Sequence, residues 1–211
     1  MKKFSCFLLV LCCLVSCFSL SAFAAEPSSS IDLQTEIYNA ENGISDVPIT
    51  PEMLGNATAF LKDKDGNIIE NLDVSMTIRK MPATRASNGV NTYTATYVAR
   101  ANKADSDTNT KDDVVATATV TWNDILGTKN TLVSVSGGWT LIGDNTISDR
   151  KVAFGSKLLN GETYTETKKP YSNSFYYSPS DITGYTLFTR TQATISTGNT
   201  ITLYVESKIT T

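Results

Sequence analysis

The side chains that could carry out chemistry in this 211-residue chain are carboxylates, lysines, tyrosines and serines. The chain contains no histidine, and its four cysteines all lie close to the N-terminus, at Cys6, Cys12, Cys13 and Cys17. Ser-His-Asp triads, Cys-His dyads and the common zinc sites need imidazole or thiolate groups. The part of the chain that follows Cys17 therefore excludes these classes of site.

Carboxylates remain as a route to catalysis, because two of them can act as acid and nucleophile, or as acid and base, in glycoside hydrolysis. The acidic residues of the second half of the chain stand in turns or polar stretches, at Asp124, Asp144, Asp149, Glu162 and Glu166. The spacing of these carboxylates does not mark any two of them as a catalytic pair. We therefore predict that the protein is not an enzyme, and a small carboxylate-pair glycosidase is the more remote alternative.

Two polar loops carry oxygen ligands at a spacing that suits calcium, one at Asp63, Asp65 and Asn67 and one at Asp105, Asp107 and Asn109. Calcium takes six to eight oxygen ligands, and neither loop has the glycine and glutamate of an EF-hand in register. In the first loop the Asp-Gly pair favours a tight hairpin turn. The second loop is a candidate calcium site formed by Asp105, Asp107, Asn109 and Asp112, and no other cofactor is predicted.

Aromatic residues offer a candidate binding surface. Four of them follow one another closely at Tyr171, Phe175, Tyr176 and Tyr177, and the second tryptophan of the chain is Trp139. Neighbouring residues of a strand point to opposite faces, so these rings either form an exposed platform or fill the core. An exposed platform would suit stacking against sugar rings or docking of a partner. Burial in the core is the favoured interpretation.

The first 24 residues have the features of a secretory signal. Two lysines precede an apolar run over residues 4–20, and Ala-Phe-Ala at residues 22–24 forms a cleavage site of small residues. We therefore predict cleavage after Ala24 and a secreted, extracellular protein.

A second interpretation of the same segment rests on Leu-Val-Ser-Cys at residues 14–17, which resembles the bacterial lipobox. Lipidation of Cys17 would anchor the chain to the bacterial cell surface through acyl groups. Secretion is favoured because the apolar sequence continues beyond Cys17 to the Ala-x-Ala site.

Cleavage after residue 24 would leave 187 residues with no cysteine. Of the 18 cationic residues Lys2 and Lys3 would be lost, so the mature chain would carry 16 cationic and 21 acidic residues and a net charge of −5. A mildly acidic chain argues against nucleic acid and anionic lipid as partners. The mature part also contains 30 threonines, which is typical of a β-rich protein, because threonine suits the solvent side of a sheet.

Alternation of apolar and polar residues predicts the elements that must position these groups. Residues 114–122 alternate strictly, and residues 132–136 do so again before Gly137, Gly138 and Trp139. Similar runs with hairpin turns between them recur along the chain, with almost no helix. We predict about ten strands in an all-β, antiparallel two-sheet sandwich, Ig-like or jelly-roll-like, preceded by a cleaved signal peptide.

The expected organisation is a signal peptide over residues 1–24, a polar leader with a strand or a short helix over residues 25–56, and the sandwich over residues 57–211. Residues 31–40 fit a strand and a helix equally well. In residues 50–54, Thr50 and Pro51 predict the start of one helical turn. We predict a secreted or surface-associated bacterial binding protein or envelope component, with a carbohydrate-binding module as the alternative and a glycan or a surface protein as partner.

Overall fold

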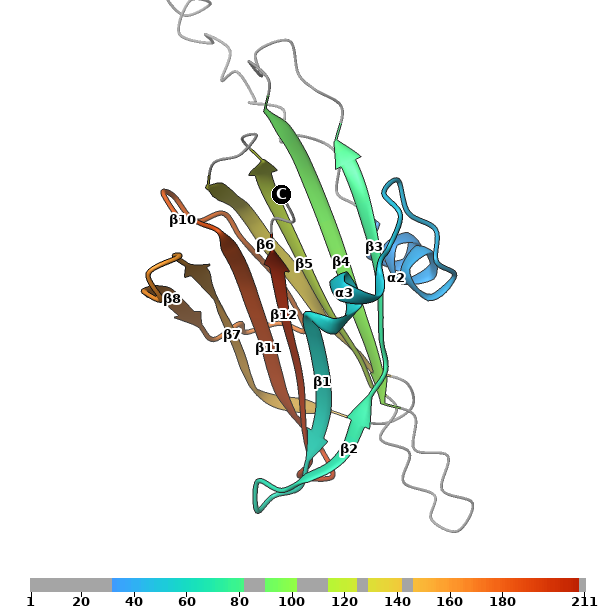
Figure 1. Ribbon diagram of the computed structural model, residues 1–211. Coiled ribbons are helices and arrows are strands. Elements are labelled where there is room, and N and C mark those ends of the chain that lie inside the picture. The colour runs from blue at the N-terminus through green and yellow to red at the C-terminus, as the bar shows by residue number, and fades with distance from the viewer. Residues whose placement is uncertain (1–31, 82–89, 102–113, 125–128, 142–145, 209–211) are drawn as a thin grey trace, which may run out of the picture. The chain divides into compact units, whose positions relative to one another are not determined.

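The computed structural model describes residues 32–81, 90–101, 114–124, 129–141 and 146–208. The described residues from position 33 onward belong to one compact unit. Its two antiparallel six-stranded sheets pack face to face, which confirms the predicted all-β sandwich (Figure 1). Within the described ranges, no helix is both long enough and apolar enough to cross a membrane.

Sheet A has the strand order β2-β1-β12-β11-β7-β8, and sheet B has the order β10-β6-β5-β4-β3, with β9 also paired to β6. The strands of sheet A are β1 (Ala57–Lys62), β2 (Ile68–Leu72), β7 (Ile147–Lys157), β8 (Thr163–Lys168), β11 (Thr186–Ile195) and β12 (Thr200–Lys208). Those of sheet B are β3 (Val74–Met81), β4 (Asn91–Ala101), β5 (Val114–Asp124), β6 (Asn130–Leu141), β9 (Ser174–Tyr177) and β10 (Thr183–Gly184).

The core lies between the sheets and is built by the inward half of each alternating strand. In β5 the inward residues are Val114, Ala116, Ala118 and Val120, all with no exposed surface, and Trp122 packs against the same cluster. Opposite them, sheet A contributes apolar side chains of β1, β7, β11 and β12. Burial of apolar area from both sheets is the main stabilising contribution in a fold of this kind.

Strand β6 is longer than the sequence pattern predicts, because it continues through Gly137 and Gly138 to Leu141. A Cβ on Gly137 would lie 2.3 Å from the carbonyl oxygen of Thr117, and one on Gly138 would lie 2.3 Å from that of Asn173. These glycines therefore allow close approach of neighbouring backbones within the sheet, and they do not end the strand.

Strand β8 was not predicted, and it places Glu166 in a strand where the sequence indicated a polar stretch. Its six residues alternate between threonine and Tyr164, Glu166 or Lys168, and all except Glu166 are exposed. An edge strand with both sides exposed has no apolar half, so hydrophobic alternation could not reveal it. With the two-residue β10, it accounts for twelve strands where about ten were expected.

The segment before β1 contains two helices. The segment over residues 31–40, which fitted a strand and a helix equally well, contains helix α2 (Leu33–Glu41). This helix buries Ile37 and Ala40 against Val98 and Val115 on the outer face of sheet B. Helix α3 (Pro51–Gly55) confirms the predicted turn, since the Thr50 hydroxyl accepts a hydrogen bond from the N–H of Met53.

The edge of sheet B at β3 is covered by the chain between the helices. The N–H of Asp46 donates to the carbonyl of Ile78 at 2.8 Å, and the Asp46 carboxylate accepts from the N–H of Lys80 at 3.0 Å. The Ser45 hydroxyl also accepts from the N–H of Ile78. Satisfying these backbone groups removes a free edge to which another strand could pair.

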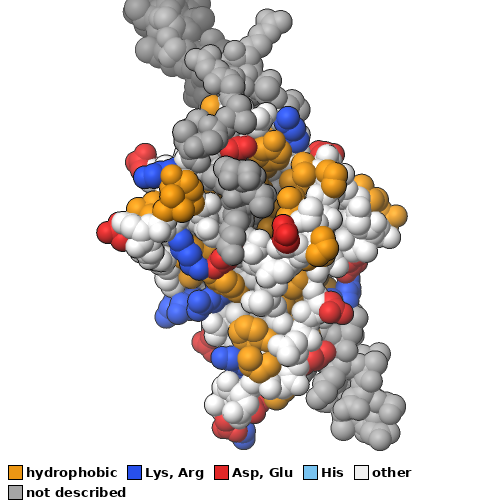
Figure 2. Space-filling view, viewed as in Figure 1, with side chains coloured by type: hydrophobic (Ala, Val, Ile, Leu, Met, Phe, Trp, Pro, Cys, Tyr) orange, Lys and Arg blue, Asp and Glu red, His pale blue; other side chains and the backbone are white. Residues whose placement is uncertain are grey.

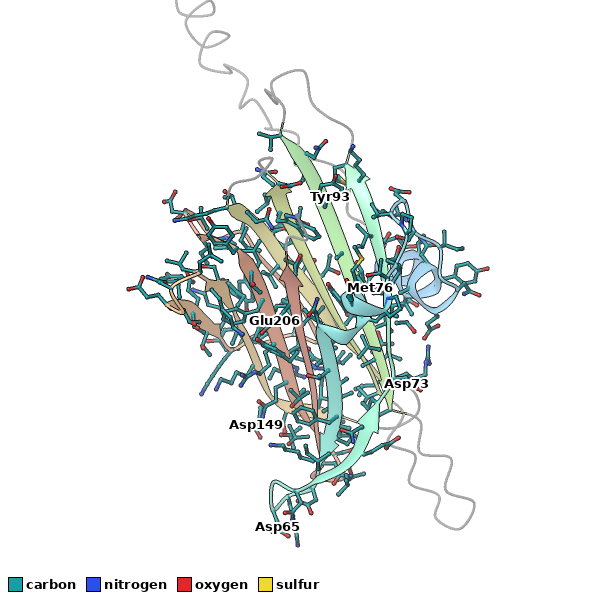
Figure 3. The ribbon with its side chains drawn as sticks, in the orientation of Figure 1. Asp65, Asp73, Met76, Tyr93, Asp149 and Glu206 are labelled. Carbon is teal, nitrogen blue, oxygen red and sulfur yellow. The ribbon has the colours of Figure 1, made fainter. Side chains whose placement is uncertain are left out.

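The first acidic loop forms the predicted hairpin turn between β1 and β2. One carboxylate oxygen of Asp63 accepts hydrogen bonds from the N–H groups of Asp65 and Asn67, each at 2.9 Å. The Asn67 side-chain amide, followed by these backbone bonds, lowers the pKa of Asp63. Figure 3 shows Asp65 at the tip of this hairpin.

Candidate functional site

The outer face of sheet A carries a shallow groove with a volume of about 340 Å³. It crosses β12, β11, β7 and β8, whose outward residues stand side by side in register. The groove is lined by Lys151, Ala153, Lys157, Thr163, Thr165, Thr167, Phe188, Arg190, Gln192 and Tyr204. We call these residues, together with the adjacent Glu206, the sheet A groove.

The floor of the sheet A groove depends on a glycine beneath an aromatic ring. Phe188 of β11 pairs with Gly155 of β7, and a Cβ on Gly155 would lie 3.1 Å from the Phe188 ring and 1.8 Å from the Tyr164 carbonyl oxygen. The ring lies over a position with no side chain, so Phe188 is only 6% exposed although it stands on the outer face. Packing of this kind fixes the ring in place.

Three polar groups form a connected cluster beside this ring. The Lys157 ammonium donates to the Tyr204 hydroxyl at 3.1 Å and to the Glu206 carboxylate, and the Tyr204 hydroxyl also donates to Glu206. Glu206 and Tyr204 raise the pKa of Lys157. Burial, followed by Glu206, raises the pKa of the Tyr204 hydroxyl. Lys157 therefore stays charged and Tyr204 stays neutral at physiological pH.

Aromatic rings hold the cations of this face in place. The Lys157 nitrogen lies 5.8 Å from the ring centres of both Phe188 and Tyr204, and the Arg190 guanidinium carbon lies 5.6 Å from the Tyr204 ring centre. Farther along the same face, the Lys62 nitrogen lies 5.4 Å from the Phe60 ring centre. Cation–π contacts at these distances restrict long side chains that would otherwise be free.

Arg190 and Lys151 are the exposed cations of the sheet A groove. Within the described part of the chain neither forms an ion pair, whereas Lys157 pairs with Glu206. The register places Arg190 opposite Ala153 and Gln192 opposite Lys151, so the two cations are diagonal neighbours on β11 and β7. Diagonal neighbours on one face of a sheet lie about 7–8 Å apart, within reach of one anionic group.

The charge of this face differs in sign from that of the whole chain. The paired outward positions of β1, β7, β11 and β12 carry Lys62, Lys151, Lys157 and Arg190 against Glu206, and the bulge of β7 adds the exposed carboxylate of Asp149. Figure 2 shows lysine and arginine side chains gathered over β7 and β11, and Figure 3 shows Glu206 over β12. The whole chain has a formal net charge of −3. Local potential therefore favours anions here, because salt screens distant charges beyond about 8 Å.

The side of the sheet A groove that β8 forms is lined by hydroxyl groups. Thr163, Thr165 and Thr167 of β8 are all exposed and stand opposite Lys157, Gly155 and Ala153. Gln192 adds an amide on β11. Cations thus face neutral donors and acceptors across a floor of small residues.

No protein-family model, curated protein or solved structure matches this chain. The geometry and chemistry of the groove are therefore the basis on which a function can be inferred.

The five aromatic residues singled out from the sequence are divided between the core and two exposed positions. Trp139 and Phe175 are buried with their ring centres 5.7 Å apart, and Tyr177 stacks on Phe154 between the sheets. Tyr176, at 67% exposure, and Tyr171 are exposed. The inward positions of β9 hold Phe175 and Tyr177, so these rings do not form one platform.

The other candidate positions lie outside the described residues. They are the calcium ligands Asp105, Asp107, Asn109 and Asp112, the lipidation site Cys17 and the signal peptide. Among the residues that are described, no group of three or more acidic side chains is arranged to hold a metal ion.

Sequence reasoning missed the sheet A groove because it followed the inward half of each strand. A usable signal was present in the outward half, where Phe188, Arg190 and Gln192 alternate with buried residues of β11, and Lys151 and Lys157 do so in β7. Only the register between the strands shows that these residues meet.

Proposed function

We propose that this protein is a secreted or surface-associated, non-enzymatic binding protein whose sheet A groove binds acidic saccharides. The observation that carries the proposal is the pair of exposed cations, Arg190 and Lys151, next to a row of threonine hydroxyls on an otherwise acidic chain. Carbohydrate binding was an alternative from the sequence, and the groove provides a different surface for it.

The preference for an anionic ligand follows from the charges of the groove. Lys157 is already paired with Glu206, so Arg190 and Lys151 are the cations left to receive a ligand carboxylate. A guanidinium can bind a carboxylate through two parallel hydrogen bonds, and the Tyr204 ring holds Arg190 before the ligand arrives. Less conformational entropy is then lost on binding.

The preference for a saccharide follows from the hydroxyl groups. Each threonine of β8 can both donate and accept a hydrogen bond, which matches the hydroxyls of a sugar ring. From Lys151 to Lys157 the groove spans seven residues of one strand, or six steps along it, about 20 Å. That length suits an oligosaccharide better than a single sugar, and the acidic character of the whole chain disfavours nucleic acid.

A binding role is favoured over hydrolysis by the composition of the groove. Its described lining residues include no carboxylate, and Glu206 beside them is bound to Lys157 and Tyr204. Glycoside hydrolysis needs two carboxyl groups on either side of the scissile bond. The groove therefore offers contacts to an acidic sugar without the pair that would cleave it.

Calorimetric titration with a galacturonic acid tetramer and a neutral galactose tetramer tests this proposal. We expect the acidic tetramer to bind and the neutral one to bind at least about ten-fold more weakly, and Arg190→Ala or Lys151→Ala to weaken acidic binding about three- to five-fold each. Lys80→Ala is the matched control, since Lys80 on sheet B also lies near a ring, Tyr93. Equal binding of both tetramers, or an equal loss in the control, would overturn the proposal.

A further inference from the structure

A second cleft lies on the opposite side of β8, between the two sheets. Its volume is about 650 Å³, within the range of ligand sites. The β7–β8 hairpin forms one wall, and residues 180–183 form the other. It is lined by Lys129, Ser156, Leu158, Glu162, Thr163, Tyr164, Ser180, Asp181, Ile182 and Thr183. We call it the interlayer cleft.

The wall opposite the hairpin is tied to both sheets, so the interlayer cleft is preformed. The carbonyl of Ile182 accepts from the N–H of Leu132 in sheet B at 2.8 Å, and the N–H of Tyr185 donates to the carbonyl of Lys157 in sheet A at 3.1 Å. Gly184 allows this segment to approach β7 closely, because a Cβ there would lie 2.6 Å from the Cβ of Ser156.

The interlayer cleft has an electron-rich aromatic wall. The Tyr164 ring is 53% exposed, and its hydroxyl donates to the Glu166 carboxylate at 3.1 Å. This bond raises the pKa of Tyr164, and Lys168 lowers the pKa of Glu166. Donation to a carboxylate keeps the phenol neutral and increases the negative charge on the ring face, which favours a cation placed over it.

Two carboxylates and one ammonium also line the interlayer cleft. Glu162 comes from the hairpin wall and Asp181 from the opposite wall, and Lys129 offsets one of their charges. Ser180, Thr183 and Thr163 add hydroxyls, while Leu158 and Ile182 add apolar surface. The net charge of the lining is therefore −1, opposite in sign to that of the sheet A groove.

We propose that the interlayer cleft binds a ligand that carries a protonated amine on a polar ring, namely an amino sugar with a free amino group. The ammonium group would lie between Glu162 and Asp181 with the sugar ring against Tyr164. This site is independent of the acidic-saccharide site, because β8 separates the two and only Thr163 lines both.

Titration with a glucosamine tetramer and an N-acetylglucosamine tetramer at about pH 6 tests the inference, because the two ligands share a sugar backbone and the nitrogen is a protonated amine in the first and a neutral, acetylated amide in the second. We expect the glucosamine tetramer to bind at least about ten-fold more tightly. The Glu162→Gln/Asp181→Asn double variant should lose that difference, and Lys129→Ala should strengthen binding about two- to three-fold. Asparagine tolerates the left-handed backbone of Asp181, whose φ is 63°.

Asp149→Asn is the matched control, because Asp149 also has a positive φ and lies near the start of β7, at the lower end of sheet A in Figure 3. It should leave glucosamine binding unchanged, as should Arg190→Ala in the sheet A groove. Equal binding of the two tetramers, or retention of the difference in the double variant, would overturn the inference. Loss of glucosamine binding in Arg190→Ala would also overturn it, because binding would then belong to the sheet A groove.

Discussion

The outer faces of the two sheets are built by the same alternation of residues and have opposite characters. On sheet A, rings and long cations stand among outward threonines and leave a groove with exposed charge. On sheet B the outward positions hold mostly threonine and serine, and helix α2 covers part of the face. The two faces differ in whether the outward side chains complete their hydrogen bonds with one another.

On sheet B they do so in pairs. The hydroxyls of Thr94 and Thr121 lie 3.1 Å apart, and those of Thr96 and Thr119 lie 3.0 Å apart. Thr96 has no exposed surface, and Thr119 is 5% exposed. Short hydroxyls in register complete their hydrogen bonds within the sheet. Lys151 and Arg190 of the sheet A groove have no such partner among the described residues, so that face is the one suited to a ligand.

The largest expected effect comes from filling the floor of the sheet A groove. Gly155→Ala should lower the free energy of unfolding by about 3 kcal/mol, because the new methyl group would collide with the Tyr164 carbonyl and the Phe188 ring. Urea denaturation measures this loss. Gly55→Ala is the control, since a Cβ there meets nothing within 4 Å. A loss below about 1 kcal/mol at Gly155 would mean that β8 can move away freely.

On sheet B, Thr96→Val should cost about 2 kcal/mol, because it leaves the buried hydroxyl of Thr119 without its partner. The Thr96→Val/Thr119→Val double variant should regain most of that loss, since both hydroxyls are then gone. A double-mutant cycle in urea checks the coupling. Additive losses would show that the two hydroxyls do not satisfy each other.

A smaller effect is expected from the ion pair of the sheet A groove. Glu206→Gln should cost about 0.5 kcal/mol of stability, because Lys157 is 40% exposed and solvent screens the pair. The same change should tighten binding of the acidic tetramer about three-fold, since Lys157 becomes available. Glu41→Gln removes the comparable Glu41–Arg100 pair. It should have a similar stability cost and leave the affinity unchanged, and a gain in both variants would contradict the account.

The smallest effect is a dependence on alkaline pH. Folding raises the pKa of Lys157 above its ordinary value of 10.5, so its contribution to stability is complete below that value and is lost as pH rises through the raised pKa. The loss should be below about 0.5 kcal/mol and should shrink in Glu206→Gln. Denaturation curves at several alkaline pH values measure it. An equal loss in both proteins would assign the dependence to other groups.

The sequence alone was sufficient to predict the sandwich, because its inward residues alternate clearly in the long strands β4, β5, β11 and β12. It missed β8, whose two faces are both polar, and it ended β6 early at glycines that serve close packing. It did not indicate either candidate site. Lys157 and Glu206 are 49 residues apart, and only the pairing of β7 and β12 with β11 brings them together.

The central claim is that the outer face of sheet A, and not that of sheet B, binds acidic saccharides. Amide NMR spectra recorded during titration with the galacturonic acid tetramer test it most directly. We expect shifts that saturate at residues of β7, β8 and β11, including Lys151 and Arg190, with none at Thr94 or Thr96 of β4. Saturating shifts centred on the threonines of sheet B, or no shifts at millimolar tetramer, would contradict the account.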